Sequence, residues 1–69
     1  MKIKVGYKWK SIEGLSKGKE FTVVAVDSQI VTYKSKETNV QFTAPRKHFE
    51  KYIERVNTYW NERNKSYKQ

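Results

Sequence analysis

Apolar and polar residues alternate over most of this chain before Pro45, which is typical of β-strands that are buried on one side. Two runs rich in valine, isoleucine, threonine and aromatic residues, 21–26 and 30–33, flank a polar turn at Asp27 and Ser28. This composition suits a pleated, half-buried surface. The two runs therefore predict a hairpin at the centre of a sheet.

A first strand is predicted over residues 2–10, where apolar and basic residues alternate. The odd-numbered residues, expected to face the core, are Ile3, Val5, Tyr7 and Trp9. The even-numbered residues, expected to face water, are Lys2, Lys4, Lys8 and Lys10. Gly6 interrupts the run and predicts a bulge or bend. These lysines would also protect an edge strand from pairing with another chain, so a structural role competes with a binding role.

The remaining strands and the first loop follow from shifts in the pattern. The apolar residues change parity after Val23, which predicts a β-bulge near residues 24–25. A strand over residues 38–43 is expected to turn Val40 and Phe42 inward. Residues 11–18 have the composition of a loop bounded by glycines, with Leu15 expected to cover one end of the strands.

Beyond Pro45 the apolar residues take helical spacing. They occur at intervals of four, three and four, at Phe49, Ile53, Val56 and Trp60. One interpretation is a continuous helix from about residue 46 to about residue 62. The other is a short turn, a closing strand over 53–56 and a looser tail, with the break at residues 57–58, which are poor helix formers. The persistence of the stripe to Trp60 favours the helix.

These elements predict a mainly β, α+β fold with a strongly bent antiparallel sheet of four to five strands and a C-terminal helix. The β domain would span residues 1–56, and residues 57–69 would form a helical extension or tail. A chain of 69 residues without cysteine must build its small core from apolar side chains alone. No segment has the length and hydrophobicity of a signal peptide or a membrane span, so we expect a soluble, cytoplasmic protein. The sequence leaves the oligomeric state open, and we favour a monomer.

Residues that could carry catalysis are scarce. His48 is the only histidine, and the seven acidic residues form no pair at a spacing that indicates acid–base chemistry. Gly14 and Gly18 lack the strand–loop–helix setting of a phosphate-binding loop. We therefore expect a protein that is not an enzyme and that has no catalytic residues, metal or cofactor.

Short motifs along the chain suggest a family. The first strand carries YKWK, the second is entered by GKEFTVVAV, the third carries VTY, and FTAPRKHF follows. Over about residues 5–56 this arrangement resembles small SH3-like β-barrel proteins, many of which are encoded by bacteriophages and prophages. The resemblance implies an SH3-like barrel closed by a short turn and a strand after FTAPRKHF. It also implies an accessory or regulatory factor without catalysis, acting in the cytoplasm of a bacterial host.

Charge indicates the kind of partner. The chain has 15 lysines and arginines against 7 acidic residues, a net charge of +8, and such a surplus attracts polyanions unless it serves only solubility. The candidate cations are Lys2, Lys4, Lys8, Lys10, Lys34, Lys36, Arg46 and Lys47, and the candidate aromatic contacts are Tyr59 and Trp60. We predict non-specific nucleic-acid binding through a lysine-rich face. The alternative is a phage-type regulatory protein that binds an acidic host protein.

Overall fold

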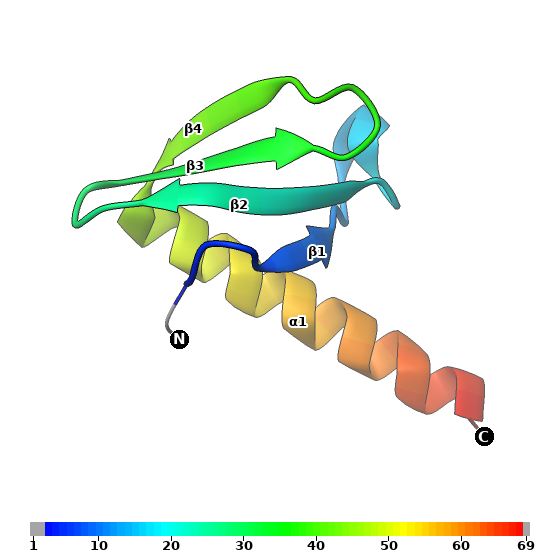
Figure 1. The fold of residues 1–69 in the computed structure, drawn as a ribbon. Coiled ribbons are helices and arrows are strands. Elements are labelled where there is room, and N and C mark those ends of the chain that lie inside the picture. Colours follow the sequence, from blue (N-terminus) through cyan, green and yellow to red (C-terminus); the bar gives the residue numbers. More distant parts are fainter. Residues whose placement is uncertain (1–2, 69) are drawn as a thin grey trace.

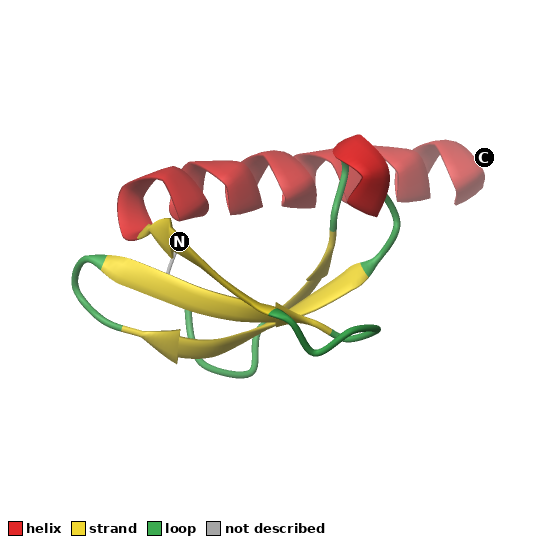
Figure 2. Ribbon diagram, turned by 90° about the horizontal axis from the view of Figure 1, so that it is seen from above, coloured by secondary structure: helices red, strands yellow, loops and turns green. Residues whose placement is uncertain are grey.

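A four-stranded antiparallel sheet lies against one long helix in the computed structural model, which describes residues 3–68 and the side chains of residues 3–63 (Figure 1). The elements in chain order are β1 (Lys8–Lys10), the 3₁₀ turn η1 (Gly14–Ser16), β2 (Glu20–Val26), β3 (Ile30–Ser35), β4 (Gln41–Pro45) and α1 (Arg46–Lys68). The strands follow one another across the sheet as β1-β2-β3-β4. Figure 2 shows that α1 covers one side of this sheet. The prediction of a small α+β fold is confirmed.

The sheet is open, with β1 and β4 at its two edges, and the closed barrel that the resemblance implies is not observed. The alternative of a closing strand over residues 53–56, which the resemblance also implies, is wrong, because these residues lie within α1 as the favoured interpretation predicted. Ile53 and Val56 are three positions apart, so a helix turns both toward the sheet, and both are fully buried there. A strand would have turned them to opposite faces.

The central hairpin has the predicted turn and bulge. The Asp27 carboxylate accepts hydrogen bonds from the backbone N–H groups of Gln29 and Ile30, each at 2.7 Å, and these bonds hold the pKa of Asp27 below its usual range. The pairing of β2 with β3 shifts between Val23 and Ala25, as the change of parity predicted.

An aromatic cluster around Trp9 forms the centre of the core. The Trp9 ring stacks on Phe21 at 5.7 Å and meets Tyr33 and Phe49 edge-on at 5.3 and 5.1 Å. The buried apolar side chains come from the N-terminal segment, three strands and the helix: Ile3, Trp9, Phe21, Val23, Val31, Phe49, Ile53 and Val56. Sheet and helix are therefore joined by large rings, which bury much area per residue.

Several side chains that were expected in the core lie outside it. Gly6 adopts φ +92° in a turn closed by the Tyr7 N–H and the Lys4 carbonyl, and this bend leaves Val5 65 % exposed. Leu15 in η1 is fully exposed instead of covering the strands. Val40 and Phe42 are 52 % and 42 % exposed, because neither belongs to the part of the sheet that packs on the helix.

Helix α1 is continuous from Arg46, directly after Pro45, and it passes residue 56 without a break. It ends at Lys68, later than the predicted end near residue 62. The Tyr7 hydroxyl donates a hydrogen bond of 3.0 Å to the Asn57 side-chain carbonyl and ties the helix to the N-terminal segment. The later turns of α1 extend beyond the sheet (Figure 1).

Ile53→Ala should lower the free energy of unfolding by about 2–5 kcal/mol, because it opens a cavity at the fully buried contact between helix and sheet. Urea unfolding followed by circular dichroism measures this decrease. The control Leu15→Ala removes an exposed side chain and should change the stability by less than about 0.5 kcal/mol. Equal effects of the two substitutions would contradict the described core.

Candidate functional site

The outer face of the sheet, opposite the helix, collects lysines from separate strands. Lys8 in β1 pairs with Thr22 in β2, and Thr22 pairs in turn with Lys34 in β3. Residues directly opposite one another in antiparallel strands project to the same face, so Lys8 and Lys34 flank Thr22. The Cα atoms of Lys8 and Lys34 are two strand spacings apart, or about 10 Å.

A second row beside the first contains two more lysines and an acid. Lys10 pairs with Glu20, and the Lys36 ammonium lies 3.2 Å from the Glu20 carboxylate. The pKa of Glu20 is lowered, first by the hydrogen bond and charge of Lys36 and then by the charges of Lys10 and Lys8. We call Lys8, Lys10, Lys34 and Lys36 the outer lysine cluster. Its four positive charges exceed the negative charges of Glu20 and of Glu37, which lies on the same surface and pairs with Lys19 at 3.6 Å.

The other predicted cations lie elsewhere. Arg46 sits at the start of α1, 3.7 Å from the carboxylate of Glu50, and donates to the Asp27 carbonyl at 3.1 Å. Lys47 is exposed on the helix, and Lys4 is exposed in the N-terminal turn. Lys2 falls outside the described residues. The structure thus brings together four of the eight predicted cations.

Tyr59 and Trp60 lie on α1 beside β1. The Trp60 indole N–H donates to the Lys10 carbonyl at 2.9 Å, so this ring is fixed to the edge of the sheet. Tyr59 meets Trp60 edge-on at 4.9 Å, and the Arg63 guanidinium lies within 6 Å of both ring centroids. The Lys10 ammonium is 6.0 Å from the Trp60 centroid, which connects this aromatic pair to the outer lysine cluster.

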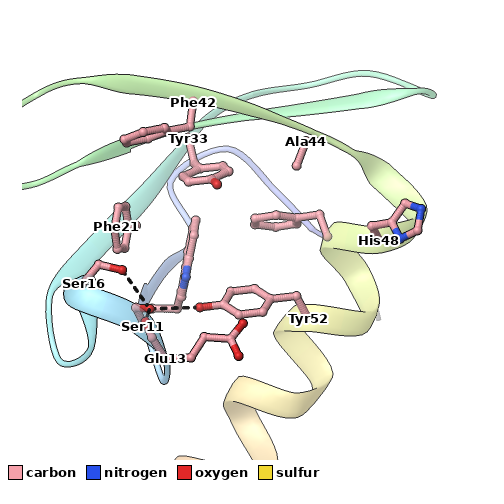
Figure 3. A pocket seen from close by; sticks show the side chains of 11 residues that line it. Ser11, Glu13, Ser16, Phe21, Tyr33, Phe42, Ala44, His48 and Tyr52 are labelled. Carbon is pink, nitrogen blue, oxygen red and sulfur yellow. Dashed lines mark hydrogen bonds between the residues drawn. The ribbon is translucent and has the colours of Figure 1, made fainter.

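A hollow of about 420 Å³ lies on the other side of the sheet, between β4 and the first turns of α1 (Figure 3). The rings of Tyr33 and Phe42 stack at 5.5 Å on its sheet side, while His48 and Tyr52 line its helix side. At its loop end the Ser11 hydroxyl accepts hydrogen bonds of 3.2 Å from Ser16 and Tyr52. This network fixes the loop against the helix.

The hollow was missed in the sequence because the aromatic residues of its sheet side, Trp9, Phe21, Tyr33 and Phe42, were expected to be packed in the core. Alternation assigned Phe42 to the inner face correctly, but it does not show how far the helix reaches across that face. The exposed side of Phe42 follows from the path of α1, which alternation does not encode.

Features of a metal site or a membrane span are absent from the described part of the chain. No three histidine, cysteine or acidic side chains among these residues lie close enough together to hold a metal ion. None of the described helices combines the length and the apolar character that crossing a bilayer requires. His48 is exposed at the rim of the hollow.

Comparisons with protein-family models, curated proteins and solved structures find no match to this chain. The case for a function therefore rests on the geometry of the two faces of the sheet.

Lys36→Gln should raise the pKa of Glu20 toward its ordinary value, because it removes the strongest interaction with the carboxylate. Lys10→Gln should raise it by less. Two-dimensional NMR of the Glu20 side-chain carboxyl carbon across a pH titration measures both shifts. Since the folded-state pKa is depressed, the stabilisation from Glu20 is present above its unfolded pKa and is lost as the pH falls through the folded value.

Lys47→Gln, which removes the same charge from the helix, is the control and should leave the Glu20 titration unchanged. An unaltered Glu20 pKa in Lys36→Gln would show that the two side chains are apart in solution.

Proposed function

We propose that this protein is a non-catalytic, sequence-independent nucleic-acid-binding protein whose interface is the outer lysine cluster. The observation that supports the proposal is the strand register, which gathers Lys8, Lys10, Lys34 and Lys36 on one exposed face. Phosphate groups are bound by such lysines, and the released counterions supply the affinity. The net charge of +8 adds a long-range attraction for any polyanion.

Uncharged donors lie among these lysines. Thr22 stands between Lys8 and Lys34, and Gln41 in β4 pairs with Lys34. Threonine hydroxyls and glutamine amides donate to phosphate oxygens alongside lysine. Contacts of this kind position a nucleic-acid backbone and carry no sequence information, so the proposed binding is non-specific.

The aromatic pair adjoins the same face at Lys10. Tyr59, whose ring centroid lies 5.8 Å from the Lys17 ammonium and 5.6 Å from the Arg63 guanidinium, offers a ring for base stacking, which single-stranded nucleic acid would use. The Trp60 indole is hydrogen-bonded to the edge of β1, and the partly exposed face of its ring is available for contact with a base. We include Tyr59 and Trp60 in the proposal as flanking contacts.

We also propose a relation to a known family, and with it an origin for this protein. A relation to small SH3-like phage or prophage proteins, acting as a monomer in the bacterial cytoplasm, is supported by the YKWK, VTY and FTAPRKHF motifs. The bent, bulged hairpin is compatible with such a relation, although the sheet is open.

The double variant Lys8→Gln/Lys34→Gln should bind a labelled single-stranded DNA more weakly, whatever its sequence. A length of about 20 nucleotides slightly exceeds the roughly 4–16 nucleotides that one small domain covers. The slope of log K against log salt should become shallower by about 0.7 for each phosphate that the variant no longer neutralises. Fluorescence anisotropy at several salt concentrations between 50 and 200 mM (roughly the range in which phosphate contacts dominate) measures both quantities.

The matched control is Lys47→Gln/Lys51→Gln, which removes the same charge from exposed positions on the helix. It should weaken binding less and leave the slope nearly unchanged. Equal decreases in affinity in both double variants would show that binding depends on the net charge of the protein and not on the outer lysine cluster. Absence of binding by the unaltered protein at low salt would refute the proposed function.

A further inference from the structure

The outer edge of β4 has no strand beside it in the described part of the chain. Two backbone bonds fix which of its residues face that edge: Ser35 N–H donates to the Val40 carbonyl at 3.1 Å, and Arg46 N–H donates to the Gln29 carbonyl at 2.9 Å. Bonded and non-bonded pairs alternate along antiparallel strands. The residues of β4 that turn their backbone groups away from β3 are therefore Gln41, Thr43 and Pro45.

Gln41 and Thr43 thus offer backbone donors and acceptors to an incoming strand. Pro45 has no N–H, so the receptive edge ends there. The opposite edge of the sheet, at β1, is protected from pairing. The Trp60 indole N–H already donates to the Lys10 carbonyl, and the charges of Lys8 and Lys10 disfavour the approach of another strand. Strand β4 itself contains no charged residue to discourage pairing.

A strand added to β4 would have two distinct faces. Its side chains beside Phe42 would point to the inner side of the sheet, over the aromatic hollow, where Phe42 is 42 % exposed and stacks on Tyr33. Its side chains beside Gln41 and Thr43 would point to the outer side, and the one beside Gln41 would continue the row that contains Lys34, Thr22 and Lys8. The inner positions suit apolar residues, and the outer position beside Gln41 suits an acidic one, with the net charge of +8 favouring acidic residues along the rest of the segment.

Charge also selects between a partner peptide and a second copy of this chain. Two copies would bring together bodies of +8 each, whose repulsion opposes edge-to-edge pairing.

The hollow itself would not repel an acidic segment strongly. The acidic residue that lines it, Glu13, has the Arg55 guanidinium 3.4 Å from its carboxylate, so the negative charge of Glu13 is countered.

We propose that the edge of β4 binds an extended peptide segment of an acidic partner protein by strand addition. The segment alternates acidic residues, which face the outer lysines, with apolar residues, one of which fills the hollow beside Phe42. This site lies at the β4 edge and shares Lys34 with the outer lysine cluster, but the inference does not depend on nucleic-acid binding there.

The probe is a fluorescein-labelled heptapeptide with glutamate at its four odd positions and isoleucine, phenylalanine and valine at its even positions. We expect saturable binding in fluorescence anisotropy, at least about tenfold tighter than that of the same peptide with lysine in place of glutamate. Methylation of the peptide amides that would face β4 should abolish binding, because strand addition depends on main-chain hydrogen bonds.

NMR of the unaltered protein locates the site. The amide protons of Gln41 and Thr43 should exchange with solvent at least about tenfold more slowly when the peptide is bound, as expected for amides paired by strand addition. Phe42→Ala should weaken binding by about tenfold, while Val5→Ala, which truncates another exposed apolar side chain, should not change it.

Three results would overturn the proposal. One is equal affinity for the glutamate and lysine peptides. Another is binding that leaves exchange at Gln41 and Thr43 unchanged. The third is protection of these amides without peptide together with a concentration-dependent dimer in sedimentation velocity, which would assign the edge to a second copy of the chain. Each result is read on the unaltered protein, so it does not depend on the variants being folded.

Discussion

The contact between the stripe of α1 and the aromatic inner face of the sheet holds the whole structure together. Phe49, Ile53 and Val56 meet Trp9 and its neighbouring rings, and no disulfide exists to supplement this contact. A domain of this size buries a smaller fraction of its surface than a larger domain does, so one well-packed layer supplies most of its stability. The helix must therefore cover the sheet on one side, and it leaves the other side free.

Because the helix covers only one side of the sheet, the two faces of the sheet differ in chemistry. The outer face, which the helix does not cover, carries lysine, threonine and glutamine in the row of Lys8, Thr22, Lys34 and Gln41, and Glu20 beside Lys10. On the inner side the helix crosses obliquely and leaves Phe42 and the hollow beside it exposed at the β4 edge (Figures 1 and 3). The cation-rich face suits a phosphate backbone, whereas the apolar edge suits an extended peptide. Both proposals thus arise from a helix that covers only part of one face.

The two edges of the sheet show how the same helix protects one strand and not another. Trp60 reaches the Lys10 carbonyl at 2.9 Å and closes the edge of β1, and the Tyr7 hydroxyl bonds Asn57 nearby. The helix starts directly after β4 and runs toward the β1 side of the sheet, away from the outer edge of β4 (Figure 1). An edge without charges or a covering element remains available for pairing.

The sequence by itself determined the local elements. The parity change after Val23 predicted the bulge, Asp27 predicted the turn, and the spacing from Phe49 to Trp60 predicted the helix, since each depends on side-chain direction along a short stretch. Only the tertiary structure decided that the sheet stays open, that Phe42 is exposed and that four lysines share one face. These features depend on strand register and on the path of the helix, which arise from packing between residues far apart in the chain.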